Sequence, residues 1–582
     1  MDTHTPGMSV AIVRQNGPEW VAGLGKADVA TGRPATADTL FRIGSTSKAF
    51  VSLAVLKLVN EGKLSLDDPV HRLAPEVWFE NRWEASDPVR VVHLLEHTTG
   101  WDDMHLREYA KDAPNTGLRV AFDYDHHSRI SRWRPGTRMA YCNSGPPVAA
   151  YIVEKITGER FEDYIQKNLF EPIGMRTATY FQPPNESAAT LYHDDGKTPY
   201  HYWNFIYRPS GSINAFANDM ANYVYFYLNR GAVNGVQVLP ASSIERMESP
   251  TSTWAAREGL KAGYGLSNYW TTYGGFVYHG HNGGLDGGLT DMGYMPDHGV
   301  GFFYSINSGS TIAFQKVGKL IRAYITRGLE KPALPAIAPL PANVAEYSGW
   351  YELASPRDEI VHFLDRLLGM IRLTIDRDRL RVMSIGGSDV YLAAAGRQFR
   401  KDSTQDPPSP IATLALLIPN QEGEFIQLGA GLTMMRIFGW FAVSEILITV
   451  FVVLGMISVL IYAPFWLLGG LSGKRRRPAE RAMRAWPLMA VLSLVGVVVV
   501  FMMTADDLID LMGNLTNWSA AVFFLTIVFA AASTMSAVAL WRANRKEVRR
   551  SVHIYSSMVT LALLIATVYL AYWGVIGLRT WA

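Results

Sequence analysis

The chain has 582 residues, too many for one hydrophobic core, so we expect two to four domains. Its 54 basic and 52 acidic side chains leave a net charge of +2, which gives no reason to expect a nucleic-acid partner. The single cysteine, Cys142, excludes an intramolecular disulfide, and we interpret it as a small buried hydrophobic side chain.

The amino-terminal region begins with a strand pattern instead of a targeting sequence. Residues 1–13 have neither the basic nor the apolar segment of a signal peptide, and a strand-like run already occupies 8–13. Removal of a leader and a misassigned start would both explain this, and the sequence does not distinguish them. Residues 1–330 mix glycine, proline, charge and aromatics as a globular α/β domain does. Four prolines within 331–343 predict a semi-rigid linker after it.

The first chemical motif, Ser-x-x-Lys, lies where a helix pattern begins. Residues 48–61 predict a helix that is apolar nearly all round at its start and closes at Gly62. Ser45 lies at the N-terminal end, where free N–H groups and the helix dipole favour a developing anion. Lys48 shares a face with Ser45, and burial lowers the pKa of a lysine so that it can accept the proton of a serine nucleophile. An N-cap serine beside a surface lysine would give the same string.

A cluster of metal-ligand residue types follows at 123–127 (DYDHH). Its spacing is loose, and we interpret it as a substrate-facing or solvated loop without a metal. The next motif is Tyr141 and Asn143, which point the same way if the segment is extended. A tyrosine near a lysine can titrate low enough to act as a base, and an asparagine can hold a substrate amide or orient the lysine.

The third motif is glycine-rich and covers residues 278–288 (YHGHNGGLDGG). Its five glycines allow a backbone to approach a ligand closely, and a backbone N–H there can complete an oxyanion hole. A glycine-rich hairpin with a structural His281 is the alternative. His279 and His281 are two ligand types, but no acid or cysteine lies at ligand spacing nearby, so we expect no metal.

A small β-rich module is predicted over 344–435. Residues 371–375 alternate between apolar and polar, and a turn at 376–379 leads into Leu380 and Val382, which indicates a hairpin. We expect a small sheet, or a barrel- or lipocalin-like domain. Its sequence contains no chemical constellation.

Residues 436–582 are expected to form a membrane region. Four apolar stretches, each long enough to cross a bilayer, cover the ranges 440–468, 486–504, 518–541 and 554–578. Tryptophans lie near their ends, as in an interfacial belt: Trp466, Trp486, Trp518, Trp541 and Trp573. The stretches contain almost no ionisable residues, so a transport pathway is not evident. Glu445 falls inside the first stretch, but residues 446–468 alone can span, which places Glu445 at the outer interface.

The loops between these stretches indicate the orientation. Loop 473–485 carries six basic residues and loop 542–553 carries five, whereas the loop between them carries three aspartates and no basic residue. By the positive-inside rule the two basic loops are cytoplasmic. The protein is then a multi-pass protein of the cell (inner) membrane, with residues 1–435 on the periplasmic or extracellular side.

Taken together in chain order, the three motifs resemble the serine beta-lactamase-like superfamily, which includes class C beta-lactamases, penicillin-binding DD-peptidases, esterases and D-amino-acid peptidases. Ser45 with Lys48 matches its Ser-x-x-Lys, Tyr141 with Asn143 its Tyr-x-Asn, and 281–283 its third motif. Further segments resemble the family at residues 94–100 (LLEHTTG), 170–175 (FEPIGM) and 210–219 (SGSINAFAND). The resemblance covers residues 6 to about 328. It implies an α/β fold with an antiparallel sheet flanked by helices and a helical subdomain.

The resemblance also implies roles for individual residues. The Ser45 hydroxyl attacks a carbonyl, and Lys48 and Tyr141 share the general-base and general-acid work. Asn143, His281 and Gly283 contribute to substrate binding, and the backbone N–H groups of Ser45 and Gly284 form the oxyanion hole. An acyl-enzyme forms and water resolves it, without a metal or a cofactor.

One departure from the family pattern bears on the substrate. Typical beta-lactamases and penicillin-binding proteins carry a lysine where this chain has His281, and a histidine is mostly neutral at pH 7. This disfavours substrates that present a carboxylate there.

The sequence therefore predicts a membrane-anchored serine peptidase, amidase or esterase that acts outside the cytoplasm. Its expected partners are the lipid bilayer and a small-molecule or peptide substrate. The expected substrates include acylated ones. A penicillin-binding or beta-lactam-hydrolysing protein, or a ligand sensor built on the same fold, is the alternative. Substrate identity and oligomeric state stay open.

Overall fold

The computed structural model describes residues 3–403, 407–471 and 478–582, which form two compact units. The first unit comprises residues up to 104, 111–357 and 371–436, and the second comprises 105–110, 358–370 and 437–582. The basic residues Lys474 to Arg477, on which the predicted orientation partly depends, lie outside the described residues.

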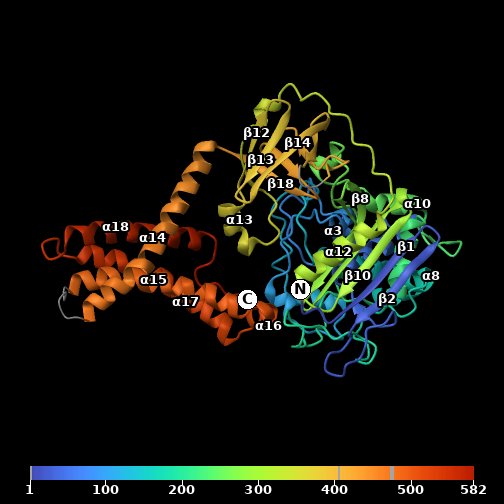
Figure 1. Ribbon diagram of the computed structural model, residues 1–582, viewed down its shortest axis with the longest axis horizontal. Helices are drawn as coiled ribbons and strands as arrows, with labels where there is room; N and C mark the ends of the chain where they lie inside the picture. Colours follow the sequence, from blue (N-terminus) through green and yellow to red (C-terminus); the bar gives the residue numbers. More distant parts are fainter. Residues whose placement is uncertain (1–2, 404–406, 472–477) are drawn as a thin grey trace. The chain divides into compact units, whose positions relative to one another are not determined.

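A six-stranded antiparallel sheet forms the centre of the first unit (Figure 1). Its strand order is β2-β1-β10-β9-β8-β7, with the bounds Gly7–Arg14 (β1), Gly17–Gly25 (β2), Tyr269–Tyr273 (β7), Phe276–Leu285 (β8), Gly288–Met295 (β9) and Val300–Ile306 (β10). The strand predicted at the amino terminus is therefore an inner strand, in register with β10 through Val10 opposite Tyr304. Its apolar run is buried on both faces, as a strand covered by helices requires.

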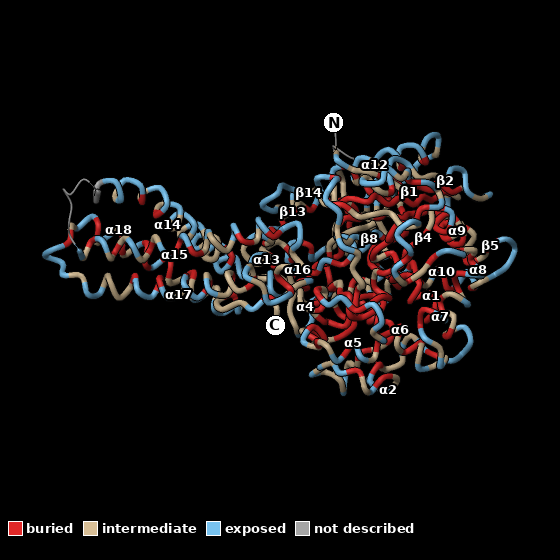
Figure 2. Tube along the Cα trace, turned by 90° about the horizontal axis from the view of Figure 1, so that it is seen from below, coloured by how far each residue is buried: buried red, intermediate tan, exposed pale blue. Residues whose placement is uncertain are grey.

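Helices cover both faces of this sheet. Along β10, Gly301 faces Val224 of α9 (Ala217–Leu228), whereas Phe302 packs with Ile321 of α12 (Thr311–Ile325). Behind α9, Phe50 of α1 stacks on Tyr223, and α1 (Lys48–Asn60) packs against α6 (Gly145–Thr157). In Figure 2 the trace around α1 and α6 is mostly buried.

Short helices and turns complete the hydrolase-like part of this unit. The helices are α2 (Val70–Leu73), α3 (Val91–Leu95), α5 (Leu118–Tyr124), α7 (Phe161–Ile165), α8 (Glu171–Ile173), α10 (Ala241–Glu248) and α11 (Trp254–Arg257). The helical turns are η1 (Gly44–Ser47), η2 (Gln166–Phe170), η3 (Arg208–Ser210) and η4 (Pro296–His298). Two short strand pairs are β3 (Phe41–Arg42) with β4 (Asn214–Ala215), and β5 (Ala232–Val233) with β6 (Val236–Gln237).

The predicted β-rich module is a closed eight-stranded barrel that follows the helical turn η5 (Val344–Tyr347). Its strands are β11 (Gly349–Leu353), β12 (Ile371–Asp376), β13 (Arg379–Ser384), β14 (Gly387–Ala395), β15 (Gln398–Asp402), β16 (Leu414–Leu416), β17 (Phe425–Leu428) and β18 (Leu432–Ile437). The predicted hairpin is the pair β12–β13, and Arg377 adopts a positive φ of 54° in its turn. Tyr351, Leu373 and Phe399 are fully buried inside the barrel. The expectation of a small β module ahead of the long apolar helices is confirmed.

The barrel docks on the hydrolase-like part within the same unit. Arg138, which precedes α6, pairs with Glu422 of the barrel at 2.5 Å, and its guanidinium carbon lies 4.6 Å from the ring centroid of Phe425. Arg397 of the barrel pairs with Glu258 at 2.9 Å. Charged and aromatic contacts therefore hold the two parts together.

The second unit contains four helices that are long and apolar enough to cross a membrane among the residues described. They are α14 (Gly439–Leu471), α15 (Pro478–Met503), α17 (Asn517–Arg542) and α18 (Arg550–Tyr572). The same unit also contains shorter elements: α4 (Leu106–Tyr109), η6 (Glu359–Val361), α13 (His362–Leu368), η7 (Ala505–Asp507) and α16 (Leu508–Gly513). Large apolar side chains such as Phe465 and Val568 are about 70% exposed, which a soluble helix bundle would avoid. Glu445, predicted near the outer interface, pairs with Arg366 of α13 at 3.0 Å.

Candidate active site

Ser45 and Lys48 lie in direct contact at the start of α1. Ser45 belongs to the turn η1, and Lys48 is the first residue of the α-helix that continues from it. The Lys48 ammonium nitrogen lies 2.9 Å from Ser45 Oγ and donates to the Ser210 carbonyl at 2.7 Å. Lys48 has no exposed surface. Burial lowers its pKa to about 7, while the charge of Asp103 opposes that shift and the charge of Arg357 adds to it.

The backbone of β8 approaches Ser45 closely because of one glycine. A Cβ on Gly283 would lie 2.1 Å from the Ile43 carbonyl oxygen and 3.0 Å from the Ser45 nitrogen, so no larger residue fits there. Gly44 adopts a positive φ of 54°, and a Cβ on it would lie 2.9 Å from the Gly284 nitrogen. The glycine-rich motif thus forms the strand β8 beside the serine, which is the arrangement that a two-amide oxyanion hole requires.

Tyr141 lies over the same pair of residues. Its hydroxyl hydrogen-bonds with Ser45, and Lys48 Nζ lies 5.1 Å from its ring centroid. Burial raises the pKa of Tyr141 above its ordinary value, more than the bond with Ser45 lowers it. This differs from the expectation of a tyrosine that titrates low beside a lysine. Desolvation outweighs the influence of Lys48, so Tyr141 keeps its proton at neutral pH and is suited to donate it.

Asn143 is held by a buried carboxylate. Its backbone N–H donates to Asp103 Oδ1 at 2.7 Å, and its side-chain Nδ2 donates to Oδ1 and Oδ2 at 3.1 Å each. Ser210 Oγ donates to the Asn143 carbonyl at 2.7 Å. These bonds tie Asn143 to Asp103 and to Ser210, whose carbonyl accepts the hydrogen bond from Lys48.

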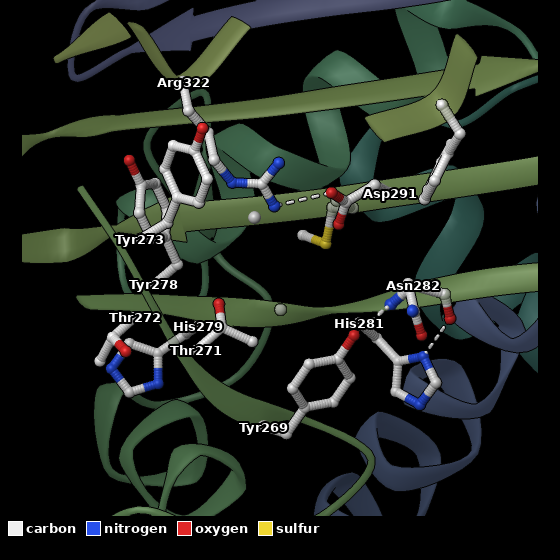
Figure 3. Close-up of a pocket in the computed structure, with 14 residues that line it drawn as sticks. Tyr269, Thr271, Thr272, Tyr273, Tyr278, His279, His281, Asn282, Asp291 and Arg322 are labelled. Carbon is white, nitrogen blue, oxygen red and sulfur yellow. Dashed lines mark hydrogen bonds and ion pairs between the residues drawn. The ribbon is translucent and has the colours of Figure 1, made fainter. Parts of the chain in front are cut away.

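His281 is locked into a chain of polar groups. Its Nε2 lies 2.6 Å from the Tyr264 hydroxyl, its Nδ1 lies 2.5 Å from the Asn282 carbonyl oxygen (dashed in Figure 3), and His97 Nε2 lies 3.2 Å from the same hydroxyl. Because a carbonyl oxygen only accepts, Nδ1 of His281 must carry the proton and Tyr264 must donate to Nε2. Burial lowers the pKa of His281 to about 3, with Lys48 contributing in the same direction. His281 is therefore neutral, and both its ring nitrogens are engaged within the protein.

The remaining chemical candidates from the sequence make no direct contact with Ser45 among the interactions of the described residues. Cys142 is fully buried, and burial raises the pKa of its thiol to about 11. Within the DYDHH cluster, Asp125 Oδ1 accepts a bond from the His127 backbone at 3.0 Å, while the His127 side chain is largely exposed. His279 packs on Trp270 and lines, with Arg322, a cavity of about 200 Å³ beside β8 (Figure 3).

Sequence reasoning missed three residues of this site. Asp103, Tyr264 and Arg357 surround the motif residues, but each is a single polar or charged residue without a spacing rule. Ser210 was visible only as part of a segment that resembles the family. Neighbourhood in sequence could not reveal them, because Asp103 and Arg357 meet across 254 residues.

The comparisons with known proteins show which family the chain belongs to. A family model described as Beta-lactamase matches residues 1–325, more than half of the chain, and the chain therefore belongs to the beta-lactamase family of serine hydrolases. The resemblance stated from the motifs is confirmed, as is the predicted fold class.

The individual relatives are named as penicillin-binding proteins and as an esterase. The chain is 26% identical to Penicillin-binding protein 4 of Amycolatopsis lactamdurans over 60% of this chain and 93% of that protein. It is 33% identical to Esterase EstB of Burkholderia gladioli over 33% of this chain, and the match spans about half (51%) of that esterase. A solved structure of the octameric penicillin-binding protein homologue from Pyrococcus abyssi is 21% identical, with a TM-score of 0.46, over 74% of this chain and 96% of that one.

Proposed function

We propose that this chain is a membrane-anchored serine hydrolase that cleaves an ester or amide outside the cytoplasm through an acyl-enzyme on Ser45. One observation carries the proposal: a fully buried Lys48, with its pKa lowered to about 7, lies 2.9 Å from the Ser45 hydroxyl. A lysine with this pKa is about half neutral at pH 7 and can accept the serine proton.

The remaining groups complete a catalytic cycle. Neutral Lys48 takes the proton as Ser45 Oγ attacks the carbonyl carbon, and the N–H groups of Ser45 and Gly284 stabilise the resulting oxyanion. Protonated Tyr141 gives its proton to the leaving alcohol or amine and recovers one from Lys48. Water then attacks the acyl-serine, its proton passes back through the same groups, and the acid product leaves.

Neutral His281 supports a substrate that presents no carboxylate to this strand. A buried imidazole whose pKa is about 3 offers no positive charge at any physiological pH. Among carbonyl substrates, this favours simple esters and amides over beta-lactams. The curated name of the similar Burkholderia gladioli protein, an esterase, points the same way.

Labelling and turnover test the chemistry. A fluorophosphonate probe should label the full-length protein, and Ser45→Ala should abolish the label. With p-nitrophenyl esters we expect a burst followed by steady turnover, and with a chromogenic cephalosporin much slower turnover. Labelling without turnover would favour a ligand sensor, and an unlabelled Ser45 would overturn the assignment.

The location is tested by reporter fusions. Alkaline phosphatase fused in the acidic loop near Asp507 should be active, and a cytoplasmic fluorescent reporter fused near Asn544 should fluoresce. This pattern would follow from the basic loop at 542–553, which the positive-inside rule places in the cytoplasm. The reversed pattern would place the hydrolase domain inside.

A further inference from the structure

We propose that Arg357, a residue of the β-barrel module, is a positioning residue of the Ser45 site: through Asp103 it holds Asn143, and its charge keeps Lys48 able to act as a base. This inference rests on the proposed function and assigns the barrel a part in it. The barrel then completes the catalytic site.

The contact between Arg357 and Asp103 is direct. Arg357 Nε and Nη2 lie 2.8 Å and 2.6 Å from Asp103 Oδ2, and the Asp103 backbone N–H donates to the Arg357 carbonyl at 3.1 Å. The Arg357 guanidinium carbon also lies 4.8 Å from the ring centroid of Tyr141. One barrel side chain thus touches both the carboxylate that holds Asn143 and the ring that covers Ser45.

Asp103 needs this partner because it is buried. Its side chain is 1% exposed, and a buried carboxylate is tolerated only where hydrogen bonds and a cation compensate its charge. The N–H groups of Asn143 and Met104 supply hydrogen bonds, and Arg357 supplies the positive charge. Loss of that charge would weaken the clamp on Asn143.

The loop that carries Arg357 is anchored on the hydrolase part. Arg132 donates to the Pro356 carbonyl at 2.8 Å, and Arg138 donates to the Ala354 carbonyl at 3.1 Å. The Ala354 N–H in turn donates to Thr433 of the barrel at 2.9 Å. Two arginines that precede Tyr141 in the chain therefore anchor the loop that carries Arg357.

The electrostatic effect on Lys48 has a definite sign. The titratable groups that act on Lys48 or feel its charge come from five places in the chain: Asp103, Arg357, Tyr141 with Cys142, His97, and His281. Burial keeps the thiol and the phenol protonated and both imidazoles neutral at pH 7. Among these groups, Asp103 and Arg357 carry charge, and they push the pKa of Lys48 in opposite directions.

The test is the pH profile of kcat/KM for p-nitrophenyl acetate, measured on the detergent-solubilised full-length chain. In Arg357→Met, the acid limb should move to higher pH by about one unit, because a like charge beside Lys48 is lost. At pH 7 this gives about a fivefold lower kcat/KM, since the neutral fraction of Lys48 falls, and most of the rate should return at pH 9. Arg357→Lys should keep the wild-type limb.

Two further variants separate this role from a structural one. Asp103→Asn should move the limb the opposite way, to lower pH, because a carboxylate that stabilises protonated Lys48 is lost. Arg397→Met removes a barrel arginine that docks on Glu258 and should leave the limb in place.

The outcomes that overturn the inference are distinct from those that overturn the function. A loss of kcat/KM in Arg357→Met that is the same at every pH would show that Arg357 only stabilises the fold. The same conclusion would follow if Arg357→Lys and Arg357→Met gave the same pH profile of kcat/KM. If Asp103→Asn does not fold, the pair of Arg357 variants still decides. A wild-type chain that neither labels at Ser45 nor hydrolyses the ester would instead refute the proposed function.

Discussion

The hydrolase-like part and the β-barrel contribute to one site in different ways. The hydrolase part supplies Ser45, Lys48 and Tyr141 from short motifs, and their chemistry is local to the start of α1 and the segment before α6. The barrel supplies one side chain from a loop after β11, and nothing in its sequence marks that residue. Reactive groups can thus be located by motif, whereas the residues that tune them are located by tertiary contact. Variants in each part test this difference.

The largest effect should come from Ser45→Ala. Removal of the attacking oxygen should lower kcat by about 10⁴ or more, because no other group in the motif can form the acyl-enzyme. The measurement is steady-state hydrolysis of a p-nitrophenyl ester by the full-length chain. Thermal unfolding should be nearly unchanged.

Ser47→Ala is the matched control within the same motif. Ser47 Oγ donates to the Gly44 carbonyl at 2.7 Å and accepts from the Ile213 N–H at 3.2 Å, so it supports the turn instead of the reaction. We expect a lower melting temperature with kcat within about tenfold of wild type. A loss in Ser47→Ala as large as that in Ser45→Ala would contradict the assignment of the nucleophile.

Gly283→Ala should have the next largest effect. The added Cβ would lie 2.1 Å from the Ile43 carbonyl oxygen, so β8 must move away from Ser45 and the two amides of the oxyanion hole must separate. We expect kcat to fall by about 10²–10³, the loss associated with one oxyanion donor. Rates of acylation in single-turnover experiments would measure it.

Gly288→Ala provides the comparison for that variant. Gly288 lies in the same hairpin, but a Cβ there meets side-chain atoms at 3.4 Å or more. Its kcat should stay within about threefold of wild type, because the added Cβ makes only ordinary van der Waals contacts. Equal losses in both glycine variants would mean that the hairpin tolerates no side chain and that Gly283 has no special position.

The acidic limb of the pH profile tests the base. The pKa of Lys48 is lowered to about 7, and the reaction requires its neutral form, so kcat/KM should rise with pH through about 7 and level off above it. Below that range the rate should fall about tenfold per pH unit. His281 should not contribute a limb between pH 5 and 9, because its pKa is about 3. An acid limb near 10 instead would mean that Lys48 is a solvated cation.

Part of this site was predictable from residues alone, and part was not. Ser45 and Lys48 are three residues apart, so helix geometry brings them together wherever the helix lies. Tyr141 and Asn143 were predictable by resemblance, but not the raised pKa of Tyr141, which depends on how deeply the folded chain buries it. The neutral state of His281 agrees with its ordinary pKa, yet the structure lowers that pKa further through burial and the charge of Lys48, and neither effect has a sequence signal at His281.

The fold divides in the same way. The apolar stretches predicted four long helices, and alternation predicted the β12–β13 hairpin, because both patterns are local. The place of β1 between β2 and β10 is set by contacts between the two ends of the hydrolase part, and closure of the barrel depends on the pairing of all its strands.

The smallest predicted effect concerns how the barrel is docked. Arg138→Met removes the ion pair with Glu422 and the bond to the Ala354 carbonyl, but keeps an apolar stem against Phe425. The melting temperature should fall by a few degrees, and kcat should fall by about two- to fivefold, because the loop that carries Arg357 loses one of its two arginine anchors. Arg381→Met, which removes an ion pair with Asp376 on the exposed surface of the barrel, should change neither quantity. If Arg138→Met lowered stability and left kcat unchanged, docking of the barrel and support of the site would be separate, and Arg132 alone would suffice to place Arg357.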